Sequence, residues 1–378
     1  MRLEQFAMER MQSTWENRVE INLSESGVHP LRVEELCDTT ELRELLLGQE
    51  LVYIQSNGTV ELRRKVAAMY PGATEDHVEI TNGGSEANYI TVWNLVEPGD
   101  EVVMMVPNYM QAWGLARGFG GQVKPWALRE VREGSVTRWR PDLDELRALV
   151  TPKTKLILIC NPNNPTGAKL TDRDLDGICR VAGAHGAWIV SDEIYRGAEL
   201  DGVDTPSIWG RYERAIVTSG LSKAYGLPGL RVGWIVAPPD RAATLWSYHD
   251  YTTISPGAIS DLLARMALDP PRRERIIART RRIIGTNYPI VREWLGGYGD
   301  LFRHAAPEAG AIVYVAYKHP INSTELILRL KDTHSVLIVP GDHFHMDGYF
   351  RLGFGSTTEY LEEGLRRLNV LLESLAKV

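Results

Sequence analysis

Short apolar runs that alternate with longer amphipathic segments constrain the fold of this 378-residue chain more than any other feature. Several runs are almost continuous in Val, Ile and Leu, which is typical of strands buried on both faces of a parallel sheet. The segments between them are long enough to form helical crossovers. The runs read HVEIT, EVVMMVP, GQVKPWAL, KLILICNP, AWIVSDE, RAIVTSG and LRVGWIVAP. They predict an α/β fold in which helices flank a mostly parallel central sheet.

A change in pattern after Asp261 predicts a second, smaller α+β domain. A long helix-rich stretch reaches Gly296, and a strand-like run, a helical run and a C-terminal helix from Thr358 follow it. The first 45 residues contain no sheet-like run, so we expect them to form an N-terminal arm and to complete the smaller domain. The domains predicted in this way are a large one over 46–280 and a small one made of 1–45 and 281–378.

Composition and charge exclude several classes of function. The chain is 44% hydrophobic and 24% charged, as globular proteins are, and 42 Lys and Arg against 49 Asp and Glu give a net charge of −7. This charge disfavours a nucleic-acid partner. No run has the length of a signal peptide or a membrane span, and three cysteines without a CxxC pair suit a reducing compartment. We therefore expect a cytoplasmic protein with no membrane association and no bound metal.

Polar motifs follow four of the predicted strands, where ligands bind in α/β sheets. NGGSEAN (82–88) opens a helix and offers N–H groups to an anion, and NPNNPTG (161–167) is a rigid turn that holds Asn amides. SDEIY (191–195) ends a buried strand in carboxylates. SKAYGLPGLRVGW (222–234) sets a lysine near an arginine, and burial beside a cation makes an amine nucleophilic, as Schiff-base chemistry requires. Each motif alone also fits an ordinary turn, cap or surface lysine.

Together these segments resemble the class I/II aminotransferases, which are fold-type I pyridoxal-phosphate-dependent enzymes. The last three motifs occur in the family's order and at its approximate spacing, and the resemblance covers nearly the whole chain. It implies that the large domain binds pyridoxal 5'-phosphate. It also implies an aminotransferase that moves an amino group from an L-amino acid to a 2-oxo acid, through a lysine Schiff base and a pyridoxamine phosphate intermediate.

The resemblance assigns the catalytic residues one by one. It implies that Lys223 forms the Schiff base and moves the proton between Cα and the cofactor, and that Asp192 keeps the pyridine nitrogen protonated. Tyr195 and Asn164 match the positions that hydrogen-bond the phenolic oxygen of the cofactor. Tyr109 matches the aromatic residue that stacks on the ring, and plain core packing is the alternative role.

The phosphate contacts implied by the resemblance come from two segments and from a second subunit. Gly84, Ser85 and Glu86 would donate backbone N–H groups, and Arg231 would grip the phosphate with its planar fork. Tyr53 matches the tyrosine that reaches across a dimer interface to the neighbouring phosphate, so the resemblance implies a homodimer.

One phosphate-binding hydroxyl departs from the family pattern. The family commonly has Ser or Thr three residues before the lysine, whereas this chain has Gly220 there. Ser219 or Ser222 would have to replace that hydroxyl, and we assign Ser222 to the cofactor site.

Substrate contacts are less constrained by the sequence. Arg351, in YFRLGFG, matches the arginine that binds the substrate α-carboxylate, and a structural salt bridge is the alternative role. We expect Asn164 and Gly27 to contact the substrate as well. Glu25 and His29, in the N-terminal segment, either contact a distal substrate group or form a cap and turn.

The sequence leaves the reaction type and the substrate side chain open. The same residues would suit a carbon–sulfur lyase, a cyclase that resembles capreomycidine synthase, or an amino-acid oxidase of this fold. His343 and His345 suggest a metal site, but no second pair of ligands accompanies them, so an exposed loop is the better interpretation. A transcription regulator with an aminotransferase-like domain is disfavoured, because no segment precedes the motifs that is long enough for a DNA-binding domain.

Overall fold

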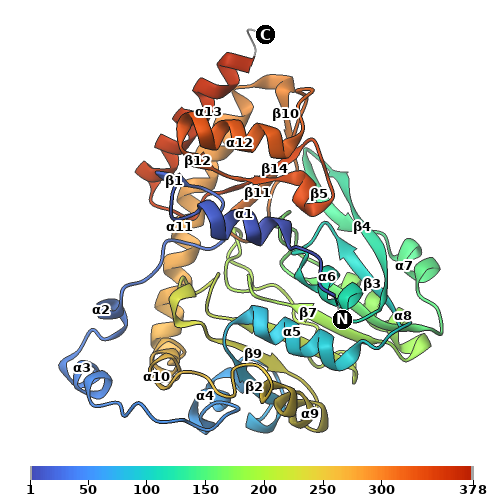
Figure 1. Cartoon of the computed structure of the whole chain (residues 1–378), viewed down its shortest axis with the longest axis vertical. Helices are drawn as coiled ribbons and strands as arrows, with labels where there is room; N and C mark the ends of the chain where they lie inside the picture. The colour runs from blue at the N-terminus through green and yellow to red at the C-terminus, as the bar shows by residue number, and fades with distance from the viewer. Residues whose placement is uncertain (1, 376–378) are drawn as a thin grey trace.

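The computed structural model describes residues 2–375, which form a large mixed sheet flanked by helices and a smaller sheet domain (Figure 1). Within these residues the large sheet has eight strands in the order β2-β9-β8-β7-β6-β3-β4-β5. In chain order the strands are β2 (Val78–Thr81), β3 (Glu101–Val106), β4 (Gln122–Glu133), β5 (Val136–Pro141), β6 (Thr154–Cys160), β7 (Trp188–Asp192), β8 (Ala215–Gly220) and β9 (Gly233–Val236). Each apolar run identified in the sequence corresponds to one of them. The predicted mostly parallel sheet is confirmed, although β9 and β5 run antiparallel to their neighbours.

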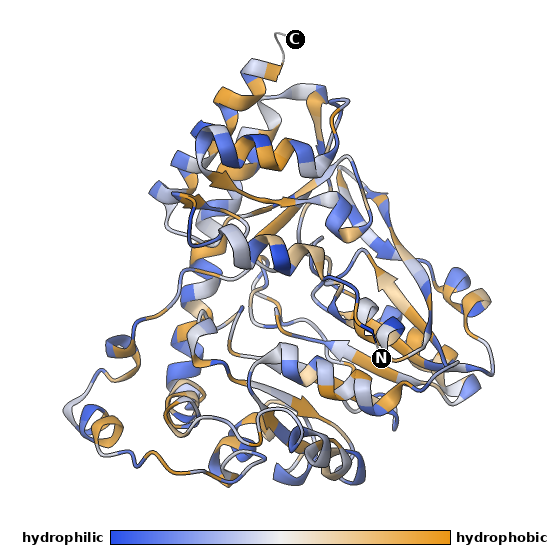
Figure 2. Ribbon diagram, in the orientation of Figure 1, coloured by the Kyte–Doolittle hydropathy of each residue, from blue (hydrophilic) through white to orange (hydrophobic). Residues whose placement is uncertain are grey.

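The strands are apolar because both faces of the large sheet are covered. Met104 belongs to one buried apolar cluster, whereas its neighbours Val103 and Met105 belong to the other. Figure 2 shows apolar residues along much of the strands of this sheet. The helices of the large domain are α4 (Val60–Ala67), α5 (Gly84–Leu95), α6 (Gln111–Gly118), α7 (Leu143–Leu149), α8 (Asp172–His185), α9 (Pro239–His249) and α10 (Ala258–Ala267).

The small domain is built on an antiparallel sheet in the order β10-β11-β14-β13, packed against two helices. Its strands are β10 (Phe302–His304), β11 (Ile312–Tyr317), β13 (Val339–Pro340) and β14 (Tyr349–Gly353), and its helices are α12 (Ser323–His334) and α13 (Thr358–Leu375). A separate pair of two-residue strands joins β1 (Ile21–Asn22) to β12 (Val336–Leu337) in parallel. The N-terminal segment thus contributes a strand where the sequence predicts none, because two residues show no alternation.

The long helix α11 (Pro270–Gly296) connects the two domains, and its interior contains Pro289. Near its middle, the Thr280 hydroxyl donates a 2.7 Å hydrogen bond to the carbonyl of Ala224 in the large domain. Two turns later, Asn287 Nδ2 donates a 2.8 Å bond to the carbonyl of Phe354 in the small domain. The predicted boundary between residues 280 and 281 therefore falls inside a continuous helix.

The N-terminal region crosses from one domain to the other (Figure 1). Helix α1 (Ala7–Trp15) lies between the small sheet and the large domain, whereas α2 (Val33–Leu36) and α3 (Thr40–Leu47) extend to one side. Leu47, the last residue of α3, and Leu51, which follows the helix, are 86% and 84% exposed. None of the helices described over residues 2–375 combines the length and apolar character needed to cross a bilayer.

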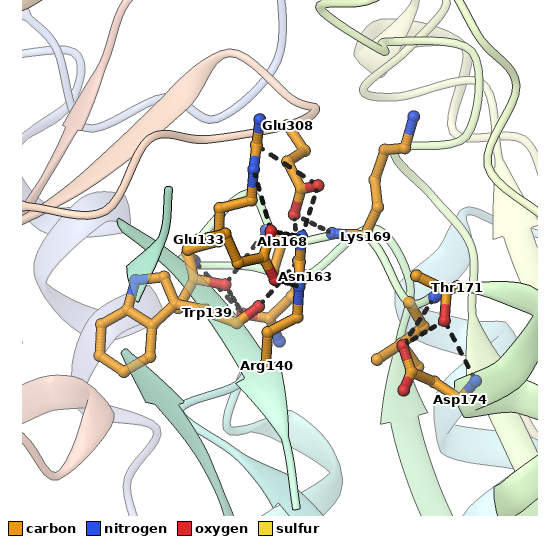
Figure 3. A network of polar contacts seen from close by, with 12 residues as sticks. Glu133, Trp139, Arg140, Asn163, Ala168, Lys169, Thr171, Asp174 and Glu308 are labelled. Carbon is orange, nitrogen blue, oxygen red and sulfur yellow. Dashed lines mark hydrogen bonds and ion pairs between the residues drawn. The ribbon is translucent and has the colours of Figure 1, made fainter. Parts of the chain in front are cut away.

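A polar network joins the NPNNPTG turn to both domains (Figure 3). Arg140 of β5 donates to Glu133 and to Glu308, each at 2.6 Å. Glu308, which precedes β11, also accepts a 3.3 Å bond from the backbone N–H of Lys169. Asn163 N–H closes the turn on the Ala168 carbonyl at 2.9 Å. This network fixes the turn that carries Asn164.

Candidate active site

A cavity of about 500 Å³ lies between the ends of the large-sheet strands and the N-terminal helix. We call its large-domain side the floor and the opposite side the roof. The floor consists of Gly84, Ser85, Asn88, Tyr109, Cys160, Asn164, Asp192, Ile194, Tyr195, Ser222, Lys223, Pro228 and Arg231. The roof consists of Met8, Glu9, Gln12, Ser13, Glu16, Glu25, Ser26 and Arg351. Most of the residues that the sequence predicts for the site therefore line one cavity.

Lys223 lies in the loop after β8 and forms an ion pair across the cavity. Its Nζ is 2.6 Å from Glu25 Oε1. Burial disfavours the charged amine, but the Glu25 carboxylate outweighs it and raises the pKa of Lys223. Burial opposes ionisation of Glu25 too, yet Lys223 and the N–H groups of Gly27 and Ser26 lower the pKa of Glu25 to about 2. The cavity thus holds Lys223 as an ammonium in this state.

Asp192 lies at the carboxyl end of β7 and is held from two sides. Asn88 Nδ2 donates to Asp192 Oδ2 at 2.9 Å, and the backbone N–H of Ile194 donates to Oδ1 at 3.1 Å. Thr218 in turn donates to Asn88 Oδ1 at 2.6 Å, which fixes the orientation of the Asn88 amide. Burial raises the pKa of Asp192, so a cation placed against this carboxylate would stabilise its charged form. Asn88 ends the NGGSEAN motif, but the sequence predicts no role for it.

Helix α5 begins at the floor and offers backbone donors there. The first N–H groups of a helix have no acceptor inside the helix, so those of Gly84 and Ser85 are available to an anion. Gly83 has φ 90°, and a Cβ on it would lie 2.4 Å from Arg231 Nη2. The absence of a side chain at position 83 therefore lets the guanidinium approach the start of α5.

Ser222 lines the cavity, whereas Ser219 does not. The hydroxyl of Ser219 donates to the backbone carbonyl of Glu193 at 3.1 Å. Of the two serines beside Gly220, Ser222 is therefore the one with access to a ligand.

Glu86 does not line the cavity, so the predicted contact with a phosphate is not supported. Its backbone N–H donates to the Gly83 carbonyl at 3.2 Å. Its carboxylate accepts from the backbone N–H of Asn82 at 2.6 Å and lies 3.3 Å from Nε2 of buried His249. His249 Nδ1 is 2.7 Å from Glu79. Glu86 therefore stabilises the start of α5 through contacts that lie outside the cavity.

Three side chains of the floor each form a hydrogen bond with a residue of the roof. The Tyr195 hydroxyl donates to Ser26 Oγ at 2.9 Å, and the Tyr109 hydroxyl donates to Glu9 Oε1 at 2.9 Å. Burial raises the pKa of Tyr195 to about 12, so its hydroxyl keeps its proton and remains a donor at neutral pH. Asn164 Oδ1 accepts a 2.8 Å bond from Arg351 Nη1.

Arg351 enters the roof from β14 and is only 1% exposed. Its guanidinium donates to Asn164 and to the carbonyl of Ser24, and its Nε has no partner. Within residues 2–375 it forms no ion pair with a carboxylate, so the alternative of a structural salt bridge is not observed. Burial lowers its pKa, and an anionic ligand would relieve that cost.

Several predicted residues lie outside the cavity. Gly27 packs beside Lys223, and its N–H donates to Glu25 at 2.8 Å, so it orders a lining residue rather than lining the cavity itself. Tyr53 is 84% exposed. None of His29, His343 and His345 lines the cavity. The segment around the last two is not simply an exposed loop, because Phe344 between them is buried and packs on Arg351.

The lining residues fit pyridoxal phosphate, which combines a phosphate, a carbonyl and a pyridine nitrogen. The start of α5 and Arg231 suit the phosphate, the Lys223 amine suits the carbonyl, and the buried Asp192 carboxylate suits a protonated ring nitrogen. All three kinds of partner face one cavity.

Comparisons with known proteins agree with this chemistry. The profile of the family described as aminotransferase class I and II matches residues 22–368. Capreomycidine synthase of Streptomyces vinaceus is 31% identical over 363 residues, which cover 94% of this chain and 90% of that protein. An aspartate aminotransferase of Streptomyces avermitilis is 30% identical over 347 residues, which cover 85% and 81%.

Among solved structures, the crystal structure of a pyridoxal-phosphate-dependent aminotransferase from Streptococcus suis has a TM-score of 0.91 at 34% identity. The match covers 99% of both chains. The resemblance inferred from the motifs is therefore confirmed. This chain belongs to the class I and II aminotransferase family, and its cofactor is pyridoxal phosphate.

Proposed function

We propose that this protein is an aminotransferase that moves an amino group from an L-amino acid to a 2-oxo acid. The observation that carries the proposal is that Lys223, Asp192 and Arg351 line a single cavity. The Lys223 amine can transfer a proton, and the Asp192 carboxylate can keep the cofactor ring protonated. The Arg351 guanidinium can bind the α-carboxylate of the substrate.

The bound cofactor would supply the carbonyl that captures the substrate amine and the ring that accepts electrons from Cα. Lys223 Nζ would take the proton from Cα of the substrate and donate it to the cofactor. Asn88 would hold Asp192 against the ring nitrogen. Arg351 would bind the α-carboxylate with its two Nη atoms, and the roof would exclude water from the reacting atoms.

The remaining cofactor contacts follow from the floor. Gly84, Ser85, Ser222 and Arg231 would hold the phosphate. Tyr195 and Asn164 would donate to the phenolic oxygen, and Tyr109 would stack on the ring. In this arrangement Tyr195 would exchange its hydrogen bond to Ser26 for one to the cofactor.

We also propose that the enzyme is a cytoplasmic homodimer. Exposed apolar side chains gather at the end of α3 and in the segment that follows it, including Leu47, Leu51, Val52 and Tyr53. Contiguous exposed apolar surface is typical of interfaces. A second subunit packed on this segment would let Tyr53 reach the neighbouring phosphate. The three cysteines are all free thiols, which suits a reducing compartment.

A single-turnover experiment tests the reaction. Holoenzyme is mixed with pooled amino acids in the absence of a 2-oxo acid, and mass spectrometry follows both cofactor and products. Transamination predicts pyridoxamine phosphate together with a new 2-oxo acid. The proposal fails if an amino acid is eliminated, oxidised or cyclised while the cofactor remains pyridoxal phosphate.

A cyclase is the second candidate function, because the relative with 31% identity over 94% of this chain is a capreomycidine synthase. The same experiment separates the two reactions. A cyclase would return a cyclised amino acid that keeps its nitrogen, with no net conversion of the cofactor.

A further inference from the structure

The roof carries a concentration of negative charge that the proposed reaction does not use. Glu9, Glu16 and Glu25 all line the cavity. Glu9 and Glu16 are seven residues apart, two turns along α1 and its C-cap, which places them on the same face of the helix. Among the described residues that line the roof, Arg351 is the one cation.

The carboxylates of Glu9 and Glu16 have no cationic partner within residues 2–375. Neither forms an ion pair there, and Glu9 accepts its hydrogen bond from the neutral hydroxyl of Tyr109. Burial raises the pKa of Glu16, the negative charges of Glu25 and Glu9 raise it further, and the positive charge of Lys223 lowers it in part. The three carboxylates are therefore close enough to repel one another.

The other charges of the cavity have partners in the proposed reaction, on which this inference rests. Arg231 would face the phosphate, Asp192 the ring nitrogen, and Arg351 the substrate α-carboxylate. Lys223 would give up its ion pair with Glu25 when its neutral amine condenses with the cofactor carbonyl and water leaves. Glu25 would then join Glu9 and Glu16 as a carboxylate without a cation.

We propose that these three carboxylates select amino acids whose side chain ends in a cation, either a guanidinium or an ammonium group. A guanidinium has five N–H donors and an ammonium has three, so either can bond several carboxylate oxygens together. The same charges disfavour aspartate and glutamate by like-charge repulsion. Neutral side chains leave the carboxylates without a counter-ion.

Pairs of substrates with matched shape test the proposal on the holoenzyme. L-Arginine is compared with L-citrulline, in which a neutral urea replaces the guanidinium, and L-lysine with L-norleucine. A charge-assisted bond predicts that kcat/KM favours the cationic member of at least one pair by about tenfold or more. Equal values within both pairs overturn the proposal, as they would if the second subunit supplied the missing cation.

A variant pair assigns the preference to the roof. Glu16→Gln removes one roof charge with little change of shape, and we expect the ratio of kcat/KM for arginine over citrulline to fall by about tenfold. Glu20→Gln is the matched control, because Glu20 lies four residues later and pairs with Arg367 instead. Equal ratios in the Glu16→Gln variant and the wild-type enzyme contradict the assignment. Cofactor absorbance verifies that both variants fold.

A binding measurement separates this inference from the proposed reaction. The desamino analogues of arginine and citrulline keep the α-carboxylate but have no amine to react. Calorimetry on the holoenzyme should show tighter binding of the guanidinium analogue by about tenfold or more, even if no amino acid is converted. Conversion of neutral or acidic amino acids at equal efficiency would leave the aminotransferase function intact and overturn the selectivity.

Discussion

The floor and the roof of the cavity are built in different ways. The floor lies at the ends of strands buried in an eight-stranded sheet within residues 2–375, and Asn88 and the start of α5 position its polar groups. The roof comes from one helix, a short loop and one strand of the small domain. A buried sheet holds catalytic atoms in the precise positions that a reaction requires. Side chains on a surface helix can be substituted with little loss of stability. The chemistry thus belongs to the floor and the selection of substrate to the roof.

Replacing Lys223, a residue of the floor, should reduce activity more than any other substitution. Lys223→Ala removes the proton carrier, and we expect single-turnover rates to fall by about 10²–10⁴-fold or more, with loss of the Schiff-base absorbance. Lys65→Ala is the control, because Lys65 pairs with Asp269 away from the cavity. Full turnover by Lys223→Ala without that absorbance would refute the assignment.

Arg351→Lys should weaken the roof and leave the floor intact. A lysine keeps the charge but loses the fork that binds a carboxylate through two atoms. We expect kcat/KM to fall by about 10–100-fold, mainly through KM. The affinity for the cofactor should not change, since Arg351 would not face the phosphate. A fall in cofactor affinity of similar size would mean that Arg351 belongs to the floor.

Asn88→Ala should damage the floor without touching the substrate. The substitution leaves the Thr218 hydroxyl and the Asp192 carboxylate without their shared partner, which should cost about 1–3 kcal/mol of unfolding free energy. Urea denaturation measures it. Asn94→Ala on the same helix is the control, because Asn94 bonds Arg241 at the partly exposed side of α5. Equal losses in both variants would contradict a special role for Asn88.

The contacts of His249 with Glu79 and Glu86, beside the start of α5, predict a smaller effect, which is a dependence of stability on pH. Burial opposes the charge on His249, but Glu79 and Glu86 outweigh it and raise the pKa of His249 to about 9. The folded protein therefore holds a proton that the unfolded chain releases near pH 6.5, so stability falls as pH rises through 9. We expect a loss of about 2 kcal/mol in unfolding free energy between pH 7 and 9.

The variant His249→Gln tests the source of this pH dependence. Glutamine keeps hydrogen-bonding capacity but does not titrate, so urea denaturation of the variant should show a flatter profile between pH 7 and 9. An unchanged slope would assign the effect to other groups.

The sequence predicted the large sheet well because its strands are buried on both faces. Strands such as β6 then read as unbroken apolar runs, whatever their neighbours are. β5 was missed because VTRWRP is polar and half exposed, and its pairing with β4 depends on a turn. The antiparallel direction of β9 follows from the path of the chain, which no local pattern records.

The floor was also easier to predict than the roof. Asn164, Asp192 and Lys223 lie in dense motifs directly after strands, and all three line the cavity. Glu9 and Glu16 lie in AMERMQSTWE, which reads as an ordinary amphipathic helix, so no signal in the sequence distinguishes them. The contact of Glu86 with His249 could not be predicted either, because His249 lies far away along the chain and only folding brings them together.

Helix α11, which connects the two halves of the site, contains a glycine and a proline four residues apart. Pro289 lacks an N–H, so the carbonyl of Gly285, four residues earlier, has no helical donor, and glycine itself resists bending least. This weak point lies beyond Thr280, which is tied to the residue next to Lys223, and around Asn287, which is tied to the small domain. A bend of α11 would therefore cost least near Gly285 and Pro289, and such a bend would change the distance between Arg351 and Lys223.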